Sequence, residues 1–350
     1  MTQNQQFSTL HPTAFFLDER VSPELTKLLT EHGWIAPDEK IESVQKPGEG
    51  NMNVVMRVST DRQTLILKQA RPWVAKYPTV AAPMERIAVE ARFYALIAPN
   101  PVLAPFMPKL IGYDVDHSLL ALEDLGAGTD FTALYQPGQH LTATDLTALM
   151  QFLSALHTIR DTGAGEPFPE NRAMRLLNHE HIFSFPFRHD TGFDLDTVQP
   201  GLQELAQPYR NNTALTDRIT RLGDVYLQSS QAASGSALIH GDFYPGSWLK
   251  TNAGIRVIDP EFSFFGPPEF DLGVLLAHLK LAQQPDDLQQ QALAEYESSG
   301  DVDPALVRAF AGVEILRRLL GLAQLPVSLG LAQKKTLLDD AAELVLAGGA

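Results

Sequence analysis

The sequence predicts an α+β protein with two lobes, a small lobe with an antiparallel sheet (residues 1–123) and a larger, mainly helical lobe (residues 124–350). Segments with β-type patterns concentrate in the first third of the chain, and amphipathic helical stripes begin at Thr142. An acidic, turn-rich stretch at residues 237–279 interrupts those helices. A chain of 350 residues is long enough for one two-lobed domain or two ordinary domains.

The composition is that of an ordinary globular protein. Apolar residues make up 44% of the chain and charged residues 20%. The formal net charge of -15 argues against nucleic acid or an anionic membrane as a partner. The chain has no cysteine, which excludes disulfides, a thiol nucleophile and a cysteine-based zinc site. Because no basic segment precedes an apolar core and no run approaches ~18 apolar residues, we expect no signal peptide, no membrane span and a cytoplasmic location.

The first lobe is expected to open with a short helical lead-in within residues 1–40, where Ser22-Pro23-Glu24 is a helix-start signal. Three strands follow, at Ile41–Gln45, Val54–Val58 and Thr64–Leu67. A further strand is expected at Leu119–Leu122. The segment Glu123-Asp124-Leu125-Gly126 then marks the connection to the second lobe.

A loop rich in glycine and asparagine joins the first two predicted strands. Such a loop lets backbone amides approach phosphate groups closely, which makes Gly48, Gly50 and Asn51 candidate phosphate ligands. The loop does not follow the G-x-G-x-x-G pattern, and alone it would be an ordinary hairpin turn. Lys68 lies at the end of the third strand, shortly after the loop. That position favours a phosphate-binding role over the alternative of a solvent-facing lysine.

A helix is expected over Met84–Ile97, and it contains a candidate partner for Lys68. A carboxylate on this helix can pair with the strand lysine and fix its ammonium group over bound phosphates. We predict that Glu90 has this role. Glu85 is the alternative partner, and an i,i+4 pair on the helix surface is the other interpretation.

Three acids in the stretch at residues 237–279 point to phosphoryl transfer. Asp242 of His240-Gly241-Asp242 can accept the proton of an attacking hydroxyl. Asp259 and Glu261 close a short β-like run, and residues i and i+2 of a strand face the same side, so both could bind one Mg²⁺ ion. The alternative is that these acids cap turns and pair with surface bases. Their order and spacing favour a nucleotide-dependent kinase.

The second lobe is expected to be mainly helical. Helices are predicted from Thr142, whose spacing to Asp145 resembles a capping box, and over Leu202–Gln228, from Phe270 to Leu281, Val307–Leu325 and Lys334–Ala347. We expect residues 163–194 to be irregular. Within them, Asn178-His179-Glu180-His181 has no zinc-binding spacing, so we interpret these histidines as helix-packing residues.

These motifs resemble the aminoglycoside phosphotransferase/choline kinase group, which has the protein-kinase-like fold. The runs HGD-x-x-x-G-S, VIDPEF-x-F-x-GP-x-x-FD, GEGNMN, LILKQA and Arg86-x-x-x-Glu90 are similar, more narrowly, to those of methylthioribose kinases. The resemblance implies ATP and Mg²⁺ as cofactors, and it implies that Glu123 and Leu125 belong to the hinge that holds adenine. It also places Ser247 at a metal position where the larger group usually carries asparagine, and Asp271 beneath the catalytic loop as a brace or a helix cap.

The same resemblance implies an acceptor, 5-methylthioribose, phosphorylated at its anomeric hydroxyl in methionine salvage. Arg317-Arg318 resembles a paired arginine motif that faces the active site in those enzymes, and a homodimer is also implied. Because adjacent helical residues point ~100° apart, we expect only one of these arginines to reach the pocket. Phe243-Tyr244 departs from the smaller polar residues typical of the family, and these aromatic rings either cover the apolar part of the acceptor or shrink the pocket.

Other functions stay open at this stage. The acceptor could be another small alcohol, such as a choline-, homoserine- or aminoglycoside-like molecule. A catalytically silent nucleotide-binding protein of the same fold would have to retain Lys68, Asp242, Asp259 and Glu261 without using them. A binding module of another fold would require accidental agreement of motifs in both lobes. A protein substrate is disfavoured, because Gly266-Pro267 follows the metal motif almost at once and leaves no room for an activation segment.

Overall fold

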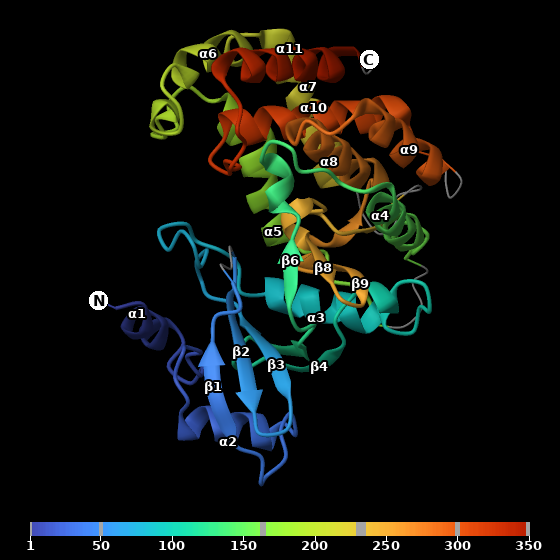
Figure 1. The fold of residues 1–350 in the computed structure, drawn as a ribbon. Helices are drawn as coiled ribbons and strands as arrows, with labels where there is room; N and C mark the ends of the chain where they lie inside the picture. The colour runs from blue at the N-terminus through green and yellow to red at the C-terminus, as the bar shows by residue number, and fades with distance from the viewer. Residues whose placement is uncertain (1, 49–51, 162–165, 229–235, 298–301, 348–350) are drawn as a thin grey trace. The chain divides into compact units, whose positions relative to one another are not determined.

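The computed structural model describes the chain except residues 1, 49–51, 162–165, 229–235, 298–301 and 348–350 (Figure 1). Contacts within the chain divide it into two compact units, Met1–Gly128 and Thr129–Ala350. The predicted boundary lies a few residues earlier, after residue 123. The first unit contains an antiparallel sheet and the second is mainly helical, which confirms the predicted α+β class.

The first unit is organised around a five-stranded antiparallel sheet with the strand order β1-β2-β3-β5-β4 (Figure 1). Its strands are β1 (Ile41–Gln45), β2 (Val54–Thr60), β3 (Thr64–Gln69), β4 (Leu110–Asp114) and β5 (Leu119–Glu123). Its helices are α1 (Gln3–Leu10), α2 (Pro23–Glu31), α3 (Arg86–Ile97) and the short 3₁₀ helix η1 (Ala104–Phe106). The predicted strands and the helix with Glu90 are all present, and their ends differ from the prediction by at most a few residues.

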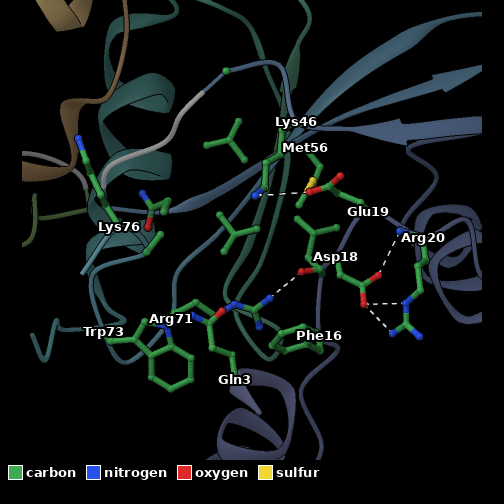
Figure 2. A pocket seen from close by; sticks show the side chains of 16 residues that line it. Gln3, Phe16, Asp18, Glu19, Arg20, Lys46, Met56, Arg71, Trp73 and Lys76 are labelled. Carbon is green, nitrogen blue, oxygen red and sulfur yellow. Dashed lines mark hydrogen bonds and ion pairs between the residues drawn. The ribbon is translucent and has the colours of Figure 1, made fainter. Parts of the chain in front are cut away.

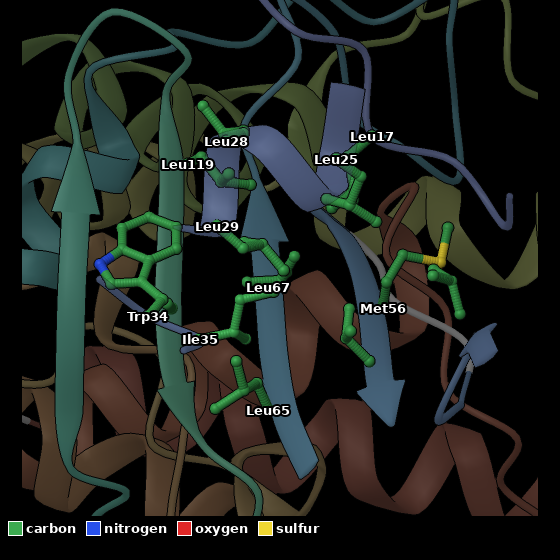
Figure 3. Close-up of a cluster of buried hydrophobic side chains, with 13 residues drawn as sticks. Leu17, Leu25, Leu28, Leu29, Trp34, Ile35, Met56, Leu65, Leu67 and Leu119 are labelled. Atoms are coloured by element: carbon green, nitrogen blue, oxygen red, sulfur yellow. The ribbon is translucent and has the colours of Figure 1, made fainter. Parts of the chain in front are cut away.

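An apolar core covers one face of this sheet. Helix α2, capped by the Ser22 side chain, packs its leucines against alternate residues of β2 and β3 (Figure 3). Met56, Leu65 and Leu67 are in this cluster and are buried. Because successive side chains of a strand alternate between faces, Lys68 lies on the opposite face from Leu67.

The second unit contains two small sheets among its helices. The strands are β6 (Gly128–Asp130), β7 (Ala237–Ile239), β8 (Trp248–Thr251), β9 (Gly254–Val257) and β10 (Phe264–Gly266), paired as β10-β7 and as β6-β8-β9. The α-helices are α4 (Ala143–Leu156), α5 (Arg172–His179), α6 (Leu202–Arg210), α7 (Thr213–Gln228), α8 (Pro268–Leu281), α9 (Asp286–Glu297), α10 (Pro304–Leu320) and α11 (Leu331–Ala347). Short helical turns are η2 (Thr132–Tyr135), the π-helix η3 (Glu180–Ser184), η4 (Phe185–Phe187), η5 (Leu195–Thr197), η6 (Pro245–Ser247) and η7 (Pro260–Phe262). None of the helices in the described part of the chain is long and apolar enough to cross a membrane.

Helices α8 and α10 form the buried centre of the second unit. Both are buried on nearly every side, as expected for helices surrounded by other elements. They approach closely at Gly273, where an added Cβ atom would lie 2.8 Å from Cβ of Phe310. This packing fixes α10, and therefore the polar residues near its C-terminal end.

Two expectations for the helical unit were wrong. Residues 163–194 are not irregular throughout, since α5 continues into the π-helix η3. Helix α5 starts at Arg172, and its N-cap residue, Asn171, has a left-handed backbone conformation. The expected single helix over residues 202–228 is two helices, α6 and α7. The helix-packing interpretation of the histidines is supported, because the rings of His179 and His181 lie 5.4 and 5.8 Å from those of Phe183 and Phe185.

Candidate active site

A buried ion pair in the first unit joins β3 to α3. Lys68 is 4% exposed and Glu90 is fully buried. The lysine Nζ lies 2.6 Å from Glu90 Oε1, which also accepts a 3.2 Å hydrogen bond from the hydroxyl of Tyr94. The pairing of Lys68 with Glu90, rather than with Glu85, is confirmed. The role of this lysine as a phosphate ligand stays a prediction.

Arg86, one turn before Glu90, anchors the end of the glycine- and asparagine-rich loop. Its guanidinium is fully buried and donates to the side chain of Asn53 at 2.8 Å and to the carbonyl of Met52 at 3.0 Å. It also donates to the carbonyls of Arg71 at 2.9 Å and Pro83 at 2.6 Å. The sequence alone showed Arg86 as part of a motif, and the structure shows what it does there: it fixes the chain on both sides of β2 and β3.

The predicted phosphate loop is described only at its ends. Gly48 lies in an exposed bend just after β1. Gly50 and Asn51 lie outside the described residues. The phosphate-binding role of all three therefore stays a prediction.

The predicted adenine hinge follows β5. The backbone N–H of Glu123 donates to the carbonyl of Lys109 at 2.9 Å, and its carboxylate accepts from the N–H of Lys109 at 3.1 Å. Leu125 is partly buried. Between them, Asp124 accepts two hydrogen bonds from Arg57, at 2.8 and 3.0 Å. The segment is thus tied to β2, and adenine binding by its backbone stays a prediction.

In the second unit, Asp271 supports the loop that carries Asp242. One carboxylate oxygen of Asp271 accepts from the backbone N–H of His240 at 2.6 Å, and the other accepts from Gly241 at 2.9 Å. Asp271 is fully buried near the start of α8, so the predicted brace is confirmed. Gly241 has a φ of 81° and lies so close to the next loop that a Cβ atom would meet the carbonyl oxygen of Phe262 at 2.4 Å. Only glycine fits this position.

His240 completes the turn from the other side. Its Nε2 lies 3.0 Å from the carbonyl oxygen of Ile258, and its Nδ1 accepts from the backbone N–H of Asp242 at 3.3 Å. These contacts require a neutral ring with its proton on Nε2, and burial correspondingly lowers the pKa of His240. Ser247 is buried, and its hydroxyl donates to the carbonyl of Asp242 at 2.9 Å. Ser247 thus stabilises the loop through its proton, and its predicted role as a metal ligand stays untested.

The two aromatic residues after Asp242 have different surroundings: Phe243 lies in the core, and Tyr244 lies beside Arg318. Phe243 is fully buried, and its ring lies 5.8 Å from that of Phe152 and 5.4 Å from that of Trp248. The expectation that Phe243 covers the acceptor or shrinks its pocket was therefore wrong. Tyr244 has a different environment, with the guanidinium of Arg318 stacked 4.8 Å from its ring.

The turn that carries Asp259 and Glu261 is not a strand. Strand β9 ends at Val257, Asp259 has a left-handed conformation with a φ of 65°, and Glu261 lies in the 3₁₀ helix η7. The argument that strand geometry places both acids on one face was therefore wrong. The side-chain amide of Asn171 holds this turn by donating to the carbonyls of Glu261 at 2.9 Å and Ser263 at 3.0 Å. A left-handed aspartate that neighbouring contacts hold in place is typical of functional sites.

The donor set of this turn suits Mg²⁺. Within the described ranges, no three histidine or carboxylate side chains converge to form a metal cage. Mg²⁺ usually binds to one or two carboxylates together with substrate phosphates and water. Asp259 is partly exposed, whereas Glu261 is 5% exposed. The chemistry of two carboxylates on one short turn matches that requirement.

Two adjacent arginines on α10 face Asp242. Nη2 of Arg318 lies 3.5 Å from Asp242 Oδ1, and Nη2 of Arg317 lies 3.8 Å from the same oxygen. The expectation that only one of them reaches the pocket was wrong. Their Cα–Cβ bonds do leave the helix ~100° apart around its axis. The two long side chains nevertheless converge, because both hold the same carboxylate, Glu314.

Glu314 is the site residue that the sequence did not reveal. It is 1% exposed and accepts from Nε of Arg317 at 2.5 Å and from Nε of Arg318 at 2.8 Å. Nε2 of His278 lies 3.0 Å from the same carboxylate, and Nδ1 of His278 lies 2.6 Å from the hydroxyl of Tyr135. Burial lowers the pKa of His278 to about 4, so its neutral ring accepts from Tyr135 and donates to Glu314.

The two carboxylates of this network have pKa values shifted in opposite directions. Burial raises the pKa of Asp242 above its usual range, although Arg318 and Arg317 partly oppose the shift. Burial acts on Glu314 as well, but the charges of the two arginines outweigh it and hold its pKa well below the usual range. Such opposite shifts are the pattern expected when one carboxylate, here Glu314, is a permanent counter-ion and the other, here Asp242, takes up a proton more readily.

The chain belongs to the phosphotransferase enzyme family, which it matches over residues 43–310. It is 28% identical to the methylthioribose kinase of Exiguobacterium sibiricum over 324 residues, covering 80% of each protein. It is 25% identical to the methylthioribose kinase of a Geobacillus species, covering 89% of this chain and 88% of that protein. The choline kinase LicA from Streptococcus pneumoniae has the same fold, with a TM-score of 0.51 at 13% identity over 93% of this chain and 99% of that one. The predicted protein-kinase-like fold is confirmed, and the chain is a small-molecule phosphotransferase.

Proposed function

We propose that this protein is an ATP-dependent kinase that phosphorylates 5-methylthioribose at its anomeric hydroxyl. The observation that carries the proposal is the position of Asp242. Its carboxylate has a raised pKa, faces two arginines and projects from a turn that Asp271 and His240 hold rigid. A hydroxyl placed on this carboxylate would lose its proton to it as the phosphoryl group is transferred.

The ion-paired lysine, the two acids of the following turn and the two arginines have further roles in this reaction. Lys68, oriented by Glu90, binds the phosphates of ATP. Asp259 and Glu261 hold Mg²⁺, which when bound neutralises charge on those phosphates. The arginines beside Asp242 stabilise the negative charge that develops on the transferring group.

The choice of acceptor rests on the relatives and on the residues around Asp242. Two of the similar proteins are methylthioribose kinases that match along most of their length. Methylthioribose has several hydroxyls and one apolar tail, so its pocket needs polar groups near the base and an apolar surface farther away. Arg317 and Arg318 supply donors, and the ring of Tyr244 supplies an apolar surface beside them. The homodimer and the cytoplasmic location stay predictions.

The proposal is tested by measuring ADP formation with methylthioribose, choline, homoserine and an aminoglycoside. The expected result is saturable turnover with methylthioribose, with kcat/KM at least ~10-fold above any other acceptor. Faster turnover with another alcohol would support the assignment as a kinase but would reject methylthioribose as its acceptor. Clear Mg-ATP binding without turnover of any alcohol would instead identify a catalytically silent nucleotide-binding protein.

A further inference from the structure

A cavity lies in the first unit, beside the start of β2. It is a pocket of about 440 Å³ between the chain that follows α1 and the ends of β1 and β2 (Figure 2). Gln69, which follows Lys68 on β3 and points to the other face, contacts the N-terminal segment that lines this pocket. The Gln69 side chain accepts from the N–H of Leu17 at 2.9 Å and donates to the carbonyl of Phe15 at 2.6 Å. These bonds hold the N-terminal segment against the sheet.

Arg71 lines this pocket and is a buried cation with unused hydrogen-bonding capacity. It is 1% exposed, and its Nη2 donates to the carbonyl of Leu17 at 2.6 Å. Two aromatic rings hold the guanidinium in place, with its Cζ 4.4 Å from the ring centre of Phe7 and 3.7 Å from that of Phe16. Its Nη1 is buried and has no hydrogen-bond partner within the part of the chain that the structure describes. A buried donor left unsatisfied is costly, which favours a ligand that accepts from it.

The charges around the pocket favour an anion. Its lining contains four basic side chains and two carboxylates, a formal excess of two positive charges. The carboxylates already have partners, because Asp18 pairs with Arg20 at 2.5 Å and Glu19 pairs with Lys46 at 3.4 Å. The excess charge therefore belongs to Arg71 and Lys76. Burial lowers the pKa of Arg71 to about 9, so its side chain is still protonated at neutral pH.

The remaining walls are apolar. Phe16, Leu17, Val54, Met56 and Trp73 line the pocket next to the guanidinium. A ligand that satisfies both parts needs an anionic oxygen group at one end and a hydrocarbon portion at the other.

We propose that this pocket binds a small organic oxyanion, a carboxylate or a phosphate monoester with an apolar tail, and that Arg71 binds its anionic end. The pocket shares Gly48 with the predicted phosphate loop, but Arg71, Lys76 and the apolar walls are distinct from the residues assigned to phosphoryl transfer. It also does not depend on the proposed acceptor, since it lies wholly in residues 3–76 of the first unit.

The test is isothermal titration calorimetry of the full chain without nucleotide, using hexanoate, hexyl phosphate and the neutral analogue hexanamide. At least one of the two anions is expected to bind saturably, and hexanamide at least ~10-fold more weakly, because it cannot form a charge-assisted hydrogen bond. The tighter of the two anions identifies the oxyanion chemistry. Absence of saturable binding by both anions at millimolar concentration, or equal binding of hexanamide, would overturn the proposal.

Variants test the residue assignment. Arg71→Met should weaken binding of the tighter anion by at least ~10-fold. Because Arg71 is buried and its loss could impair folding, Lys76→Met provides a second test at an exposed position, with an expected loss of roughly 2- to 5-fold. Lys27→Met, an exposed lysine on α2 that does not line the pocket, is the matched control and should bind like the parent. Unchanged affinity in a folded Arg71→Met protein, or in Lys76→Met, would contradict the assignment.

Discussion

The two units hold their buried charges in different ways. In the first unit, Lys68 and Glu90 form one close contact of 2.6 Å. In the second, two arginines face two carboxylates, and the contacts are unequal: 2.5 and 2.8 Å to Glu314, but 3.8 and 3.5 Å to Asp242. The comparison teaches that the two arginines have one close counter-ion, Glu314, and contact Asp242 less closely. Glu314 neutralises the arginines, which leaves Asp242 available for the proton-accepting role proposed above.

The largest effect is expected from removing the carboxylate of Asp242, the proposed proton acceptor. Asp242→Asn should lower kcat by about 10²-fold or more, since a positioned general base contributes on that scale. Mg-ATP affinity, measured by calorimetry, should change little, because the change removes no predicted nucleotide ligand. Near-normal turnover of the purified variant would show that Asp242 is not the proton acceptor, and the proposed difference in role between Asp242 and Glu314 would fail.

Glu314→Gln tests whether Glu314 is the close counter-ion of the two arginines. It leaves two buried arginines without their close counter-ion, so it should lower the free energy of unfolding by about 3 kcal/mol. Urea denaturation measures this effect, and Glu343→Gln, an exposed glutamate on α11, is the control. A loss no greater than that of the control would mean that Asp242 balances the arginines after all.

Asp259→Ala separates metal binding from proton transfer. Losing one oxygen ligand should weaken Mg-ATP binding by about 10-fold and leave residual activity that rises with added Mg²⁺. Calorimetry and a Mg²⁺ titration of the rate provide the two readouts. Unchanged Mg-ATP affinity would place the metal elsewhere.

Single and double substitutions separate the contributions of the two arginines beside Asp242. Because both guanidinium groups approach Asp242, Arg317→Met and Arg318→Met should each raise the acceptor KM by about 10-fold or lower kcat, with ATP affinity little changed. Steady-state kinetics with the true acceptor measures this effect. If both single variants and the double variant behave like the parent, the pair has no part in catalysis, and the argument for methylthioribose loses its structural support.

The smallest effect is on stability as a function of pH. Burial raises the pKa of Asp242, so the folded chain binds this proton more tightly than the unfolded chain does. Holding Asp242 ionised in the folded chain therefore lowers the free energy of unfolding. This loss of stability is absent below the unfolded pKa of about 3.9 and fully present above the folded pKa. Asp242→Asn should have a higher Tm than the parent at pH 7, and the difference should shrink as the pH falls toward about 4. Calorimetric scans that show a pH-independent difference, or a less stable variant, would contradict the raised pKa.

The sequence predicted four of the five strands in the sheet of the first unit and most helices, because their patterns are local, whereas β4 (Leu110–Asp114) was missed. The bounds of β1 agree with the prediction, and α2 begins at the predicted Ser22 cap. The helix α5 was missed since its start is a left-handed asparagine among prolines and histidines rather than an ordinary cap. The break between α6 and α7 was missed since the apolar pattern continues across it.

The individual site residues were easier to predict than the arrangement around them. Asp242, Asp259 and Lys68 stand in recognisable motifs, and Asp271 was expected to support the loop. Glu314 could not be identified, because glutamate three and four residues before arginines is also the pattern of an exposed helical ion pair. Only the packing of α10 against α8 shows that the group is buried. The left-handed conformation of Asp259 likewise depends on the neighbouring turn and has no sequence signal of its own.

The support for Asp242 has a consequence for folding order. The carboxylate of Asp271 binds backbone groups only 30 and 31 residues earlier in the chain, and β7 pairs with β10 within the same segment. Closing these loops of 30 and 31 residues costs roughly 0.8 kcal/mol less entropy than closing the 75-residue loop from Asp242 to Arg317, which favours earlier formation of this segment. Arg317 and Arg318 belong to α10, which lies much later in the chain. The backbone of the turn that carries Asp242 is therefore held by contacts outside α10, whereas the charge beside it comes from α10, so substitutions in α10 should change the charge around Asp242 more than its position.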